Sequence, residues 1–332
     1  MIKVAINGFG RIGRHTFKVA LKNSEMEVVA INDLTDPKTL AHLFKYDTAY
    51  PEFVGEVGFD EENLIVDGKK VRVFAEKEPE KLPWGKMEID VVVESTGVFR
   101  TGEEAGRHIK AGAKRVVISA PAKSEEVSTY LRGVNDEEYD GKEIINNASC
   151  TTNCAAPVIR VLNDIFGVEK AFLTTVHSYT SDQRLQDAPH KDLRRARAAA
   201  MNIVPTTTGA AIATTKVIPE LEGKFDGISI RVPTLSVSLT DFVAVLKKDT
   251  TVEEINEAFI DASKGYLKDV LAVSNEPLVS SDYIGNPYSA IVDLEFTKVV
   301  GGNLVKVLAW YDNEWGYANR LVEMVERVGK KI

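Results

Sequence analysis

The chain has 332 residues, long enough for two domains of ordinary size. Its net charge of -8 comes from 41 basic and 49 acidic side chains, a balance that argues against a general nucleic-acid-binding protein. No apolar run reaches the roughly 18 residues of a membrane span, and the N-terminus reads as a strand, not as a signal peptide. The two cysteines, Cys150 and Cys154, share a predicted helix and are poorly placed for a disulfide, so we expect a reducing, cytoplasmic setting.

The first half of the chain alternates short β-branched runs with amphipathic stretches. This alternation predicts a doubly wound α/β domain of the Rossmann type, built on a parallel sheet. The expected strands are 3–7, 27–32, 89–94 and 115–119, and the expected helices are 11–22, 37–44 and 103–110.

The second half carries longer strand-like runs and fewer helical stretches. This pattern predicts an α+β domain with a large, mainly antiparallel sheet. The expected strands are 170–176, 226–232, 235–247 and 303–311, and the expected helices are 252–264 and a final one over 316–328.

A glycine-rich turn follows the first predicted strand and opens the first predicted helix. Residues 8–13, Gly-Phe-Gly-Arg-Ile-Gly, fit the G-x-G-x-x-G pattern of dinucleotide sites. Gly8 allows a tight turn, Gly10 lets a pyrophosphate approach the backbone, and Gly13 lets the helix pack closely. Asp33 ends the next strand, where it can bind ribose hydroxyls and repel a 2′-phosphate. The alternative is a glycine-rich turn in an α/β protein without a cofactor.

Cys150 is the candidate nucleophile. Ser149 resembles an N-cap and residues 154–162 resemble a helix, so Cys150 falls in the first turn. There the helix dipole favours a thiolate, and free backbone N–H groups can hold an oxyanion. A small buried cysteine is the alternative, and it is the interpretation that we prefer for Cys154.

His177 is the candidate base for this thiol. It ends the predicted strand 172–177, ahead of a polar loop, and that position suits a cysteine–histidine pair. The remaining histidines lie in helical or basic contexts and are interpreted as structural or solvent-facing. They are His15, His42, His108 and His190.

Three features predict a substrate that carries phosphate. Residues 190–197 form a basic cluster in an acidic protein, and residues 205–209 offer threonine hydroxyls and free N–H groups. Arg231 interrupts an apolar strand, which is costly unless an anion pairs with it. No metal is expected, because two cysteines on one helix without a histidine motif do not make a tetrahedral zinc site.

Several motifs together resemble the phosphorylating glyceraldehyde-3-phosphate dehydrogenases of the bacterial, glycolytic type, over essentially the whole chain. The stretch Ala-Ser-Cys-Thr-Thr-Asn-Cys is the most specific of them. The motifs lie at residues 6–14, 148–154, 176–180, 194–200, 205–211 and 310–317. The resemblance implies oxidation of glyceraldehyde 3-phosphate to 1,3-bisphosphoglycerate, with NAD as cofactor, inorganic phosphate as second substrate and a cytoplasmic homotetramer.

The resemblance also assigns residues. Cys150 is the nucleophile that forms a hemithioacetal and then a thioester, and His177 is its base. The cofactor residues are Gly8, Gly10, Arg11, Ile12, Gly13, Asp33, Lys77, Ser119 and Asn313. The substrate phosphate is assigned to Thr180, Arg195 and Arg231, and the attacking phosphate to Ser149, Thr151, Thr208 and Gly209. The expected NAD-binding domain is discontinuous, 1–149 with 313–332, and the catalytic domain is 150–312.

Two positions depart from the family pattern. Ala188 stands where NAD-specific members usually have a leucine that a neighbouring subunit contributes against NADP. Since Asp33 is present, NAD preference with weaker discrimination is expected. Lys77 stands where bacterial members often have arginine.

Two other interpretations of the function remain: an erythrose-4-phosphate dehydrogenase on the same scaffold, and a non-catalytic, NAD-responsive binding or redox-sensing protein.

Overall fold

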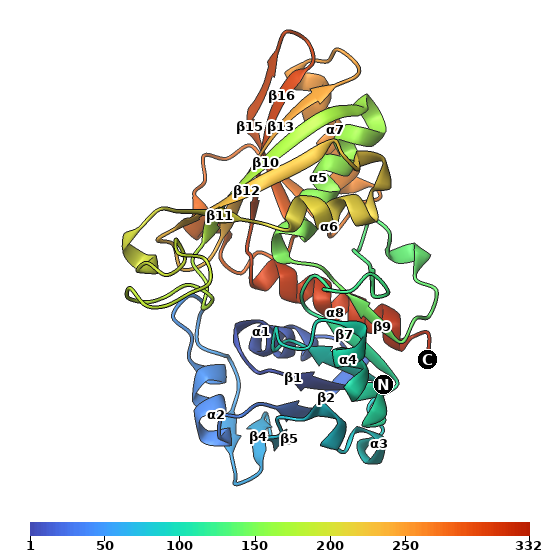
Figure 1. Cartoon of the computed structure of the whole chain (residues 1–332), viewed down its shortest axis with the longest axis vertical. Coiled ribbons are helices and arrows are strands. Elements are labelled where there is room, and N and C mark those ends of the chain that lie inside the picture. The colour runs from blue at the N-terminus through green and yellow to red at the C-terminus, as the bar shows by residue number, and fades with distance from the viewer. The chain divides into compact units, whose positions relative to one another are not determined.

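The computed structural model describes all 332 residues, Met1–Ile332 (Figure 1). The chain divides into two compact units: unit 1 comprises Met1–Ala148 with Ala318–Ile332, and unit 2 comprises Ser149–Tyr317. The boundary at which the chain returns to unit 1 lies between Tyr317 and Ala318, inside the last helix. The sequence placed this boundary a few residues earlier, between 312 and 313. Asn313 belongs with unit 2, where its side chain accepts a hydrogen bond from Ser238.

Unit 1 contains a nine-stranded sheet in the order β3-β4-β5-β2-β1-β6-β7-β9-β8. All neighbours from β5 to β8 run parallel, whereas β3, β4 and β5 pair antiparallel. The strands are β1 (Ile2–Asn7), β2 (Met26–Asn32), β3 (Val57–Phe59), β4 (Asn63–Val66), β5 (Lys69–Phe74), β6 (Val91–Glu94), β7 (Arg115–Ile118), β8 (Ser128–Thr129) and β9 (Ile144–Asn146). The helices are α1 (Arg11–Ala20), α2 (Pro37–Lys45), α3 (Trp84–Met87), α4 (Gly102–Lys110) and α8 (Trp315–Gly329), which continues from unit 2.

The predicted Rossmann-type domain is thus confirmed, and its central strands are mostly buried. Every residue of β6 is buried, as expected of a parallel strand covered on both faces. The β4–β5 hairpin was not predicted. Its signal is the Asp67–Gly68 turn, in which both residues have positive φ (48° and 77°), because an Asp-Gly pair is typical of two-residue hairpin turns.

Unit 2 contains a seven-stranded sheet in the order β11-β12-β10-β13-β16-β15-β14. Four of its pairings are antiparallel, which confirms the predicted mainly antiparallel sheet. The strands are β10 (Val168–Ser178), β11 (Val204–Thr207), β12 (Phe225–Val232), β13 (Ser238–Leu246), β14 (Leu271–Ser274), β15 (Ala290–Val300) and β16 (Leu304–Tyr311). The helices are α5 (Cys150–Phe166), α6 (Ala210–Val217) and α7 (Val252–Lys264).

Helix α5 packs on β13, β15 and β16, and α7 packs on β14 and β15. Along β10 buried and exposed side chains alternate, so one face of the sheet meets the helices while Phe172 points away from them. None of the helices combines the length and the apolar composition that a membrane span requires.

Candidate active site

The glycine turn of unit 1 has the geometry of a phosphate-binding turn. Gly8 has φ of +92°, and a Cβ on it would lie 2.7 Å from the amide nitrogen of Thr96. A Cβ on Gly13 would lie 2.2 Å from the carbonyl oxygen of Gly8. A Cβ on Gly10 would meet no atom within 4 Å, so the space beside Gly10 is open. Two glycines are therefore required by the fold, and the third leaves room for a ligand at the start of α1.

A cavity of about 460 Å³ opens beside this turn. It is lined by Gly8, Gly10, Asp33 and Lys77. The other lining residues are Asn7 and Asn32, which end β1 and β2, and residues that follow β2, β5 and β6: Leu34, Glu76, Ser95, Thr96, Val98 and Phe99. The exposed apolar side chains among them, Leu34 and Val98, were missed from the sequence. They suit one face of an aromatic ring, and exposed hydrophobic residues directly after strand ends are the signal that would have found them.

Asp33 is held rigidly at the wall of this cavity. Its Oδ2 accepts from the backbone N–H of Phe9 at 2.8 Å, and its Oδ1 accepts from Thr35 at 3.0 Å. A carboxylate has further lone pairs, so hydroxyl groups of a ribose can still donate to it. This arrangement fits the dinucleotide site expected from the sequence.

Five other predicted cofactor residues do not line the cavity: Arg11, Ile12, Gly13, Ser119 and Asn313. The guanidinium of Arg11 pairs with Asp47 at 2.5 Å, and this leaves its backbone, not its charge, for a ligand. Ser119 follows β7, and its N–H donates to the carbonyl of Glu94.

A buried polar network that the sequence did not reveal supports the cavity wall. The carboxylate of Glu94 accepts from Asn7 Nδ2 at 2.5 Å, from the N–H of Thr96 at 2.9 Å and from His108 Nε2 at 3.0 Å. His108 Nδ1 accepts from Trp84 Nε1 at 3.0 Å, which places the ring proton on Nε2. The network fixes the loop after β6. His108 is structural, as predicted, but it is buried against a carboxylate that helps to shape the cavity.

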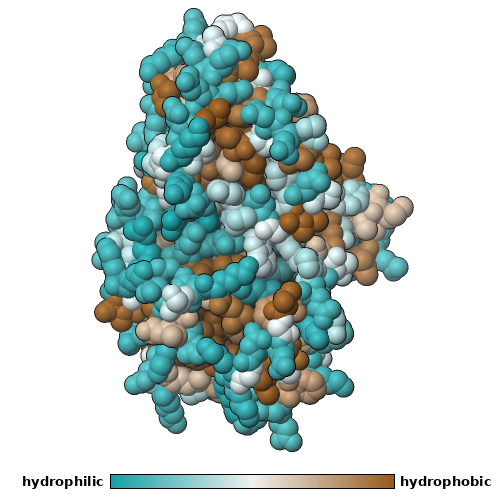
Figure 2. Space-filling view, turned by 180° about the vertical axis from the view of Figure 1, so that it is seen from behind, coloured by the Kyte–Doolittle hydropathy of each residue, from teal (hydrophilic) through white to brown (hydrophobic).

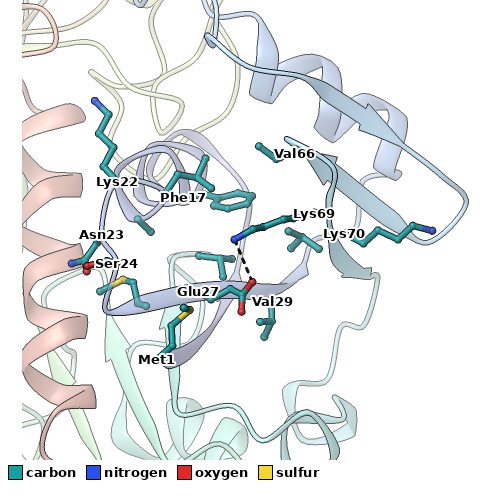
Figure 3. Close-up of a pocket in the computed structure, with 15 residues that line it drawn as sticks. Met1, Phe17, Lys22, Asn23, Ser24, Glu27, Val29, Val66, Lys69 and Lys70 are labelled. Atoms are coloured by element: carbon teal, nitrogen blue, oxygen red, sulfur yellow. Dashed lines mark ion pairs between the residues drawn. The ribbon is translucent and has the colours of Figure 1, made fainter.

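Unit 1 has a second cavity, of about 280 Å³, which shares no lining residue with the first (Figure 3). Its floor is apolar and includes Phe17, and at its rim Lys69 faces Glu27 at 3.9 Å. No cysteine or histidine lines it. We therefore place the chemistry of the protein elsewhere.

Cys150 and His177 lie together in unit 2. Ser149 is the N-cap of α5, since its hydroxyl accepts from the N–H of Thr152 at 3.1 Å, and Cys150 is the first residue of the helix. His177 lies near the end of β10, with its Nε2 3.4 Å from the sulfur of Cys150. Nδ1 of His177 lies 2.7 Å from the carbonyl oxygen of Ser178, so Nδ1 carries the proton and Nε2 offers its lone pair to the thiol.

The expectation of a thiolate favoured by the helix dipole is corrected by the structure. Burial raises the pKa of the Cys150 thiol, and the positive charge of Arg231 only partly opposes this rise. Burial lowers the pKa of His177 to about 3, and Arg231 adds to the lowering. The pair rests as a neutral thiol and a neutral imidazole, so His177 is free to accept a proton near pH 7.

Arg231 is a largely buried cation without a carboxylate partner. Its Nη1 donates only to neutral oxygens, the Ser178 carbonyl at 3.2 Å and the Thr180 hydroxyl at 3.3 Å, and its Nε has no partner. The contact of Nη1 with His177 Nδ1 at 3.2 Å joins two donors and adds no bond. Burial lowers the pKa of Arg231. A buried unpaired charge is costly, so this position is suited to an anionic ligand.

A tyrosine hydroxyl ties the cysteine to the histidine strand. Tyr311 Oη lies 2.9 Å from the hydroxyl of Thr151, next to Cys150, and 2.8 Å from that of Thr175, two residues before His177. Because the Thr151 side chain is buried in this contact, it is positioned to hold the helix start as well as to meet a ligand. No pattern in the sequence indicated this role of Tyr311.

The remaining predicted anion ligands lie in unit 2 with different local partners. Arg195 forms an ion pair with Asp182 at 2.5 Å and donates to Thr206 at 2.9 Å. Thr208 and Gly209 precede α6, and the Thr208 hydroxyl accepts from the first N–H of that helix at 3.2 Å. Arg195 is thus already partly neutralised, in contrast to Arg231.

Comparison with known proteins agrees with these features. The chain matches the glyceraldehyde 3-phosphate dehydrogenase NAD-binding domain over residues 2–102 and the C-terminal domain of the same family over residues 149–313. It is 55% identical over 332 residues to glyceraldehyde-3-phosphate dehydrogenase of Geobacillus stearothermophilus, covering 99% of both chains. It is 54% identical to glyceraldehyde-3-phosphate dehydrogenase 1 of Bacillus subtilis (strain 168), again covering 99% of both. The resemblance drawn from the motifs is confirmed: the chain belongs to the glyceraldehyde-3-phosphate dehydrogenase family and is an oxidoreductase that uses NAD.

Proposed function

We propose that the protein oxidises glyceraldehyde 3-phosphate and phosphorylates the product to 1,3-bisphosphoglycerate through a thioester on Cys150. The observation that carries this proposal is a thiol–imidazole pair, with the Cys150 sulfur 3.4 Å from His177 Nε2, beside a largely buried arginine that lacks an anionic partner. The pair supplies nucleophile and base, and the arginine supplies the charge that a phosphorylated aldehyde requires. Relatives named glyceraldehyde-3-phosphate dehydrogenase support the same substrate.

The first step is addition of the thiol to the aldehyde. The sulfur of Cys150 bonds to the carbonyl carbon, His177 Nε2 takes the thiol proton, and that proton passes to the new oxygen to give a hemithioacetal. Free N–H groups of the first turn of α5 stabilise negative charge on that oxygen. Arg231 and Thr180 hold the phosphate of the substrate, and Arg195 contributes once its pairing with Asp182 loosens.

The second step is oxidation. His177 Nε2 removes the hydroxyl proton of the hemithioacetal as the carbon loses a hydride, and the product is a thioester on Cys150. When bound, the nicotinamide of NAD supplies the hydride acceptor. His177 can act in both steps because its proton on Nδ1 is held by the Ser178 carbonyl.

The third step releases the product. An oxygen of inorganic phosphate attacks the thioester carbon, the carbon–sulfur bond breaks, and the Cys150 thiol recovers its proton from His177. We assign the attacking phosphate to Ser149, Thr151, Thr208 and Gly209 as a set. The start of α6 supports part of this assignment, because helix N-termini favour anions.

In this proposal the cavity beside the glycine turn, residues 8–13, holds the cofactor. Gly8, Gly10, Arg11, Ile12 and Gly13 face the pyrophosphate, mainly through their backbone. Further contacts are assigned to Asp33 and Lys77 on the adenosine side and to Ser119 and Asn313 on the nicotinamide side. Ala188 is exposed, and we expect it to weaken discrimination against NADP relative to a leucine.

We infer that the protein is a cytoplasmic homotetramer. The sheet of unit 2 exposes Phe172, Ile228 and Val243 on β10, β12 and β13, on the face that points away from α5 and α7. Figure 2 shows hydrophobic residues exposed among polar ones on the surface. An apolar sheet face of this kind favours association with a second copy. Sedimentation of the protein tests this, and a monomer at micromolar concentration would contradict it.

The test of the proposed activity is NADH formation from glyceraldehyde 3-phosphate, with and without phosphate, and with NAD against NADP. We expect phosphate-dependent turnover that prefers NAD. Cys150→Ser should abolish turnover while retaining NAD binding, and residual turnover at the level of the unmodified enzyme would refute the thioester route. The relatives do not favour the erythrose-4-phosphate and non-catalytic readings. Higher kcat/KM for erythrose 4-phosphate would restore the first of them.

A further inference from the structure

A buried serine links Ser178, the residue after the catalytic histidine, to the amide of Asn313. The hydroxyl of Ser238, at the start of β13, accepts from the N–H of Ser178 at 3.1 Å and donates to Asn313 Oδ1 at 2.9 Å. Ser238 is only 2% exposed. Both of its hydrogen bonds are therefore made within the protein.

These contacts decide which end of the Asn313 amide faces outward. The proton of the Ser238 hydroxyl has one acceptor, Asn313 Oδ1. If the amide turned over, two donors would face the serine oxygen and the hydroxyl proton would lose its acceptor in a buried place. Asn313 is only 5% exposed, and its Nδ2 has no hydrogen-bond partner in the chain. This nitrogen atom is nevertheless not sealed from solvent. The outward group is thus a donor.

The same residue that contacts Ser238 also holds the catalytic base. The carbonyl oxygen of Ser178 accepts from His177 Nδ1, while its N–H donates to Ser238. The two contacts use different groups of Ser178, so an effect of Ser238 on His177 is tested separately from its effect on Asn313.

We propose that Ser238 is a positioning residue that orients Asn313 as a hydrogen-bond donor toward the carbonyl oxygen of the nicotinamide carboxamide. This inference rests on the proposed function, in which Asn313 contacts that group. An oriented donor selects cofactors by their carbonyl oxygen. The 3-acetylpyridine analogue of NAD keeps this oxygen but lacks the NH₂ group, so the native enzyme should accept it.

Ser238→Ala tests the orientation. Without the serine the amide can turn over, and its Oδ1 can then accept from the carboxamide NH₂, which only NAD carries. We expect the ratio of kcat/KM for NAD to that for the analogue to rise about fivefold, the weight of one hydrogen bond. Ser229→Ala is the matched control, since Ser229 is a buried serine in the same sheet whose hydroxyl has no partner. It should leave the ratio unchanged.

Asn313→Asp supplies the turned-over state permanently, because an oxygen faces outward in either orientation. Its ratio should rise further than that of Ser238→Ala. Adding Ser238→Ala to Asn313→Asp should then change the ratio no more, because the serine acts through the amide. An additive effect in the double variant would overturn the proposal.

Two further measurements distinguish the positioning of the Asn313 amide from an effect of Ser238 on His177. The rate at which iodoacetamide alkylates Cys150 needs no cofactor and should be unchanged in Ser238→Ala, whereas a fall matching that of kcat would place the effect on His177 and overturn the proposal. The dissociation constants of NAD and the analogue should shift in the same direction as the kinetic ratio. If the unmodified enzyme forms no NADH, the proposed function fails, yet these dissociation constants still test Ser238. An unchanged ratio in every assay overturns the proposal.

Discussion

Replacing His177 with asparagine should remove a pH-dependent loss of stability. The folded chain binds no proton on this ring until about pH 3, whereas the unfolded chain binds one below its ordinary pKa of 6.5. Between these values the unfolded state holds the extra proton, so stability falls as pH falls. Each pH unit corresponds to about 1.4 kcal/mol, which gives about 2 kcal/mol between pH 6.5 and pH 5 and about 5 kcal/mol down to pH 3. Asparagine is neutral throughout and can still donate to the Ser178 carbonyl.

The measurement is urea-induced unfolding of both proteins, followed by tryptophan fluorescence near pH 7, 6 and 5. Protein concentration must be held fixed, because subunit association adds to stability. Other titrating groups cancel in the difference between the two proteins. The free energy of unfolding of the native chain, relative to His177→Asn, should drop by about 2 kcal/mol over this range. A constant difference would show that the ring is not buried as a neutral base, and the resting state inferred for the Cys150 pair would then be wrong.

Three further changes are predicted from the site geometry. Gly10→Ala should fold normally but lose NAD affinity, because its Cβ enters only the open space that the ligand needs. Gly13→Ala should destabilise the fold, since its Cβ would lie 2.2 Å from the Gly8 carbonyl oxygen. Melting temperatures and NAD titrations of both variants test this, and equal thermal stability of the two would contradict it. Arg231→Gln should raise KM for glyceraldehyde 3-phosphate by about 10- to 100-fold, the value of a charge-assisted bond, and leave KM for NAD unchanged; a change confined to NAD would move the anion site elsewhere. Tyr311→Phe should lower the free energy of unfolding in denaturant by about 2 kcal/mol and lower kcat, because two buried threonine hydroxyls lose their partner. An unchanged kcat would show that the Tyr311 hydroxyl does not help to align the cysteine and the histidine.

Much of the architecture follows from local pattern. The alternation of strands and helices in residues 1–119 predicted the parallel sheet, because period and turn residues act over a few positions. For the same reason we could recognise the glycines at 8, 10 and 13 and the cysteine that follows an N-capping serine. The β4–β5 hairpin was missed because its strands are short, although the Asp67–Gly68 turn marked it.

The chemistry of the site depends on contacts between distant parts of the chain. Sequence made His177 one candidate among five histidines, and only the fold brings it within 3.4 Å of Cys150. Tyr311 reaches Thr151 across 160 positions, and His108 meets Glu94 in a network that closes only when α4 packs on β7, the neighbour of β6 in the sheet.

The sequence by itself determined the two domain types, the dinucleotide turn, the nucleophile and the family. Tertiary structure decided the protonation states and the orientation of the groups. A helix start argued for a thiolate on Cys150, yet burial raises the pKa of that thiol and holds His177 neutral. The reason is physical: propensities and motifs are properties of neighbouring residues, whereas desolvation and hydrogen-bond direction are set by every atom that surrounds a group once the chain is packed.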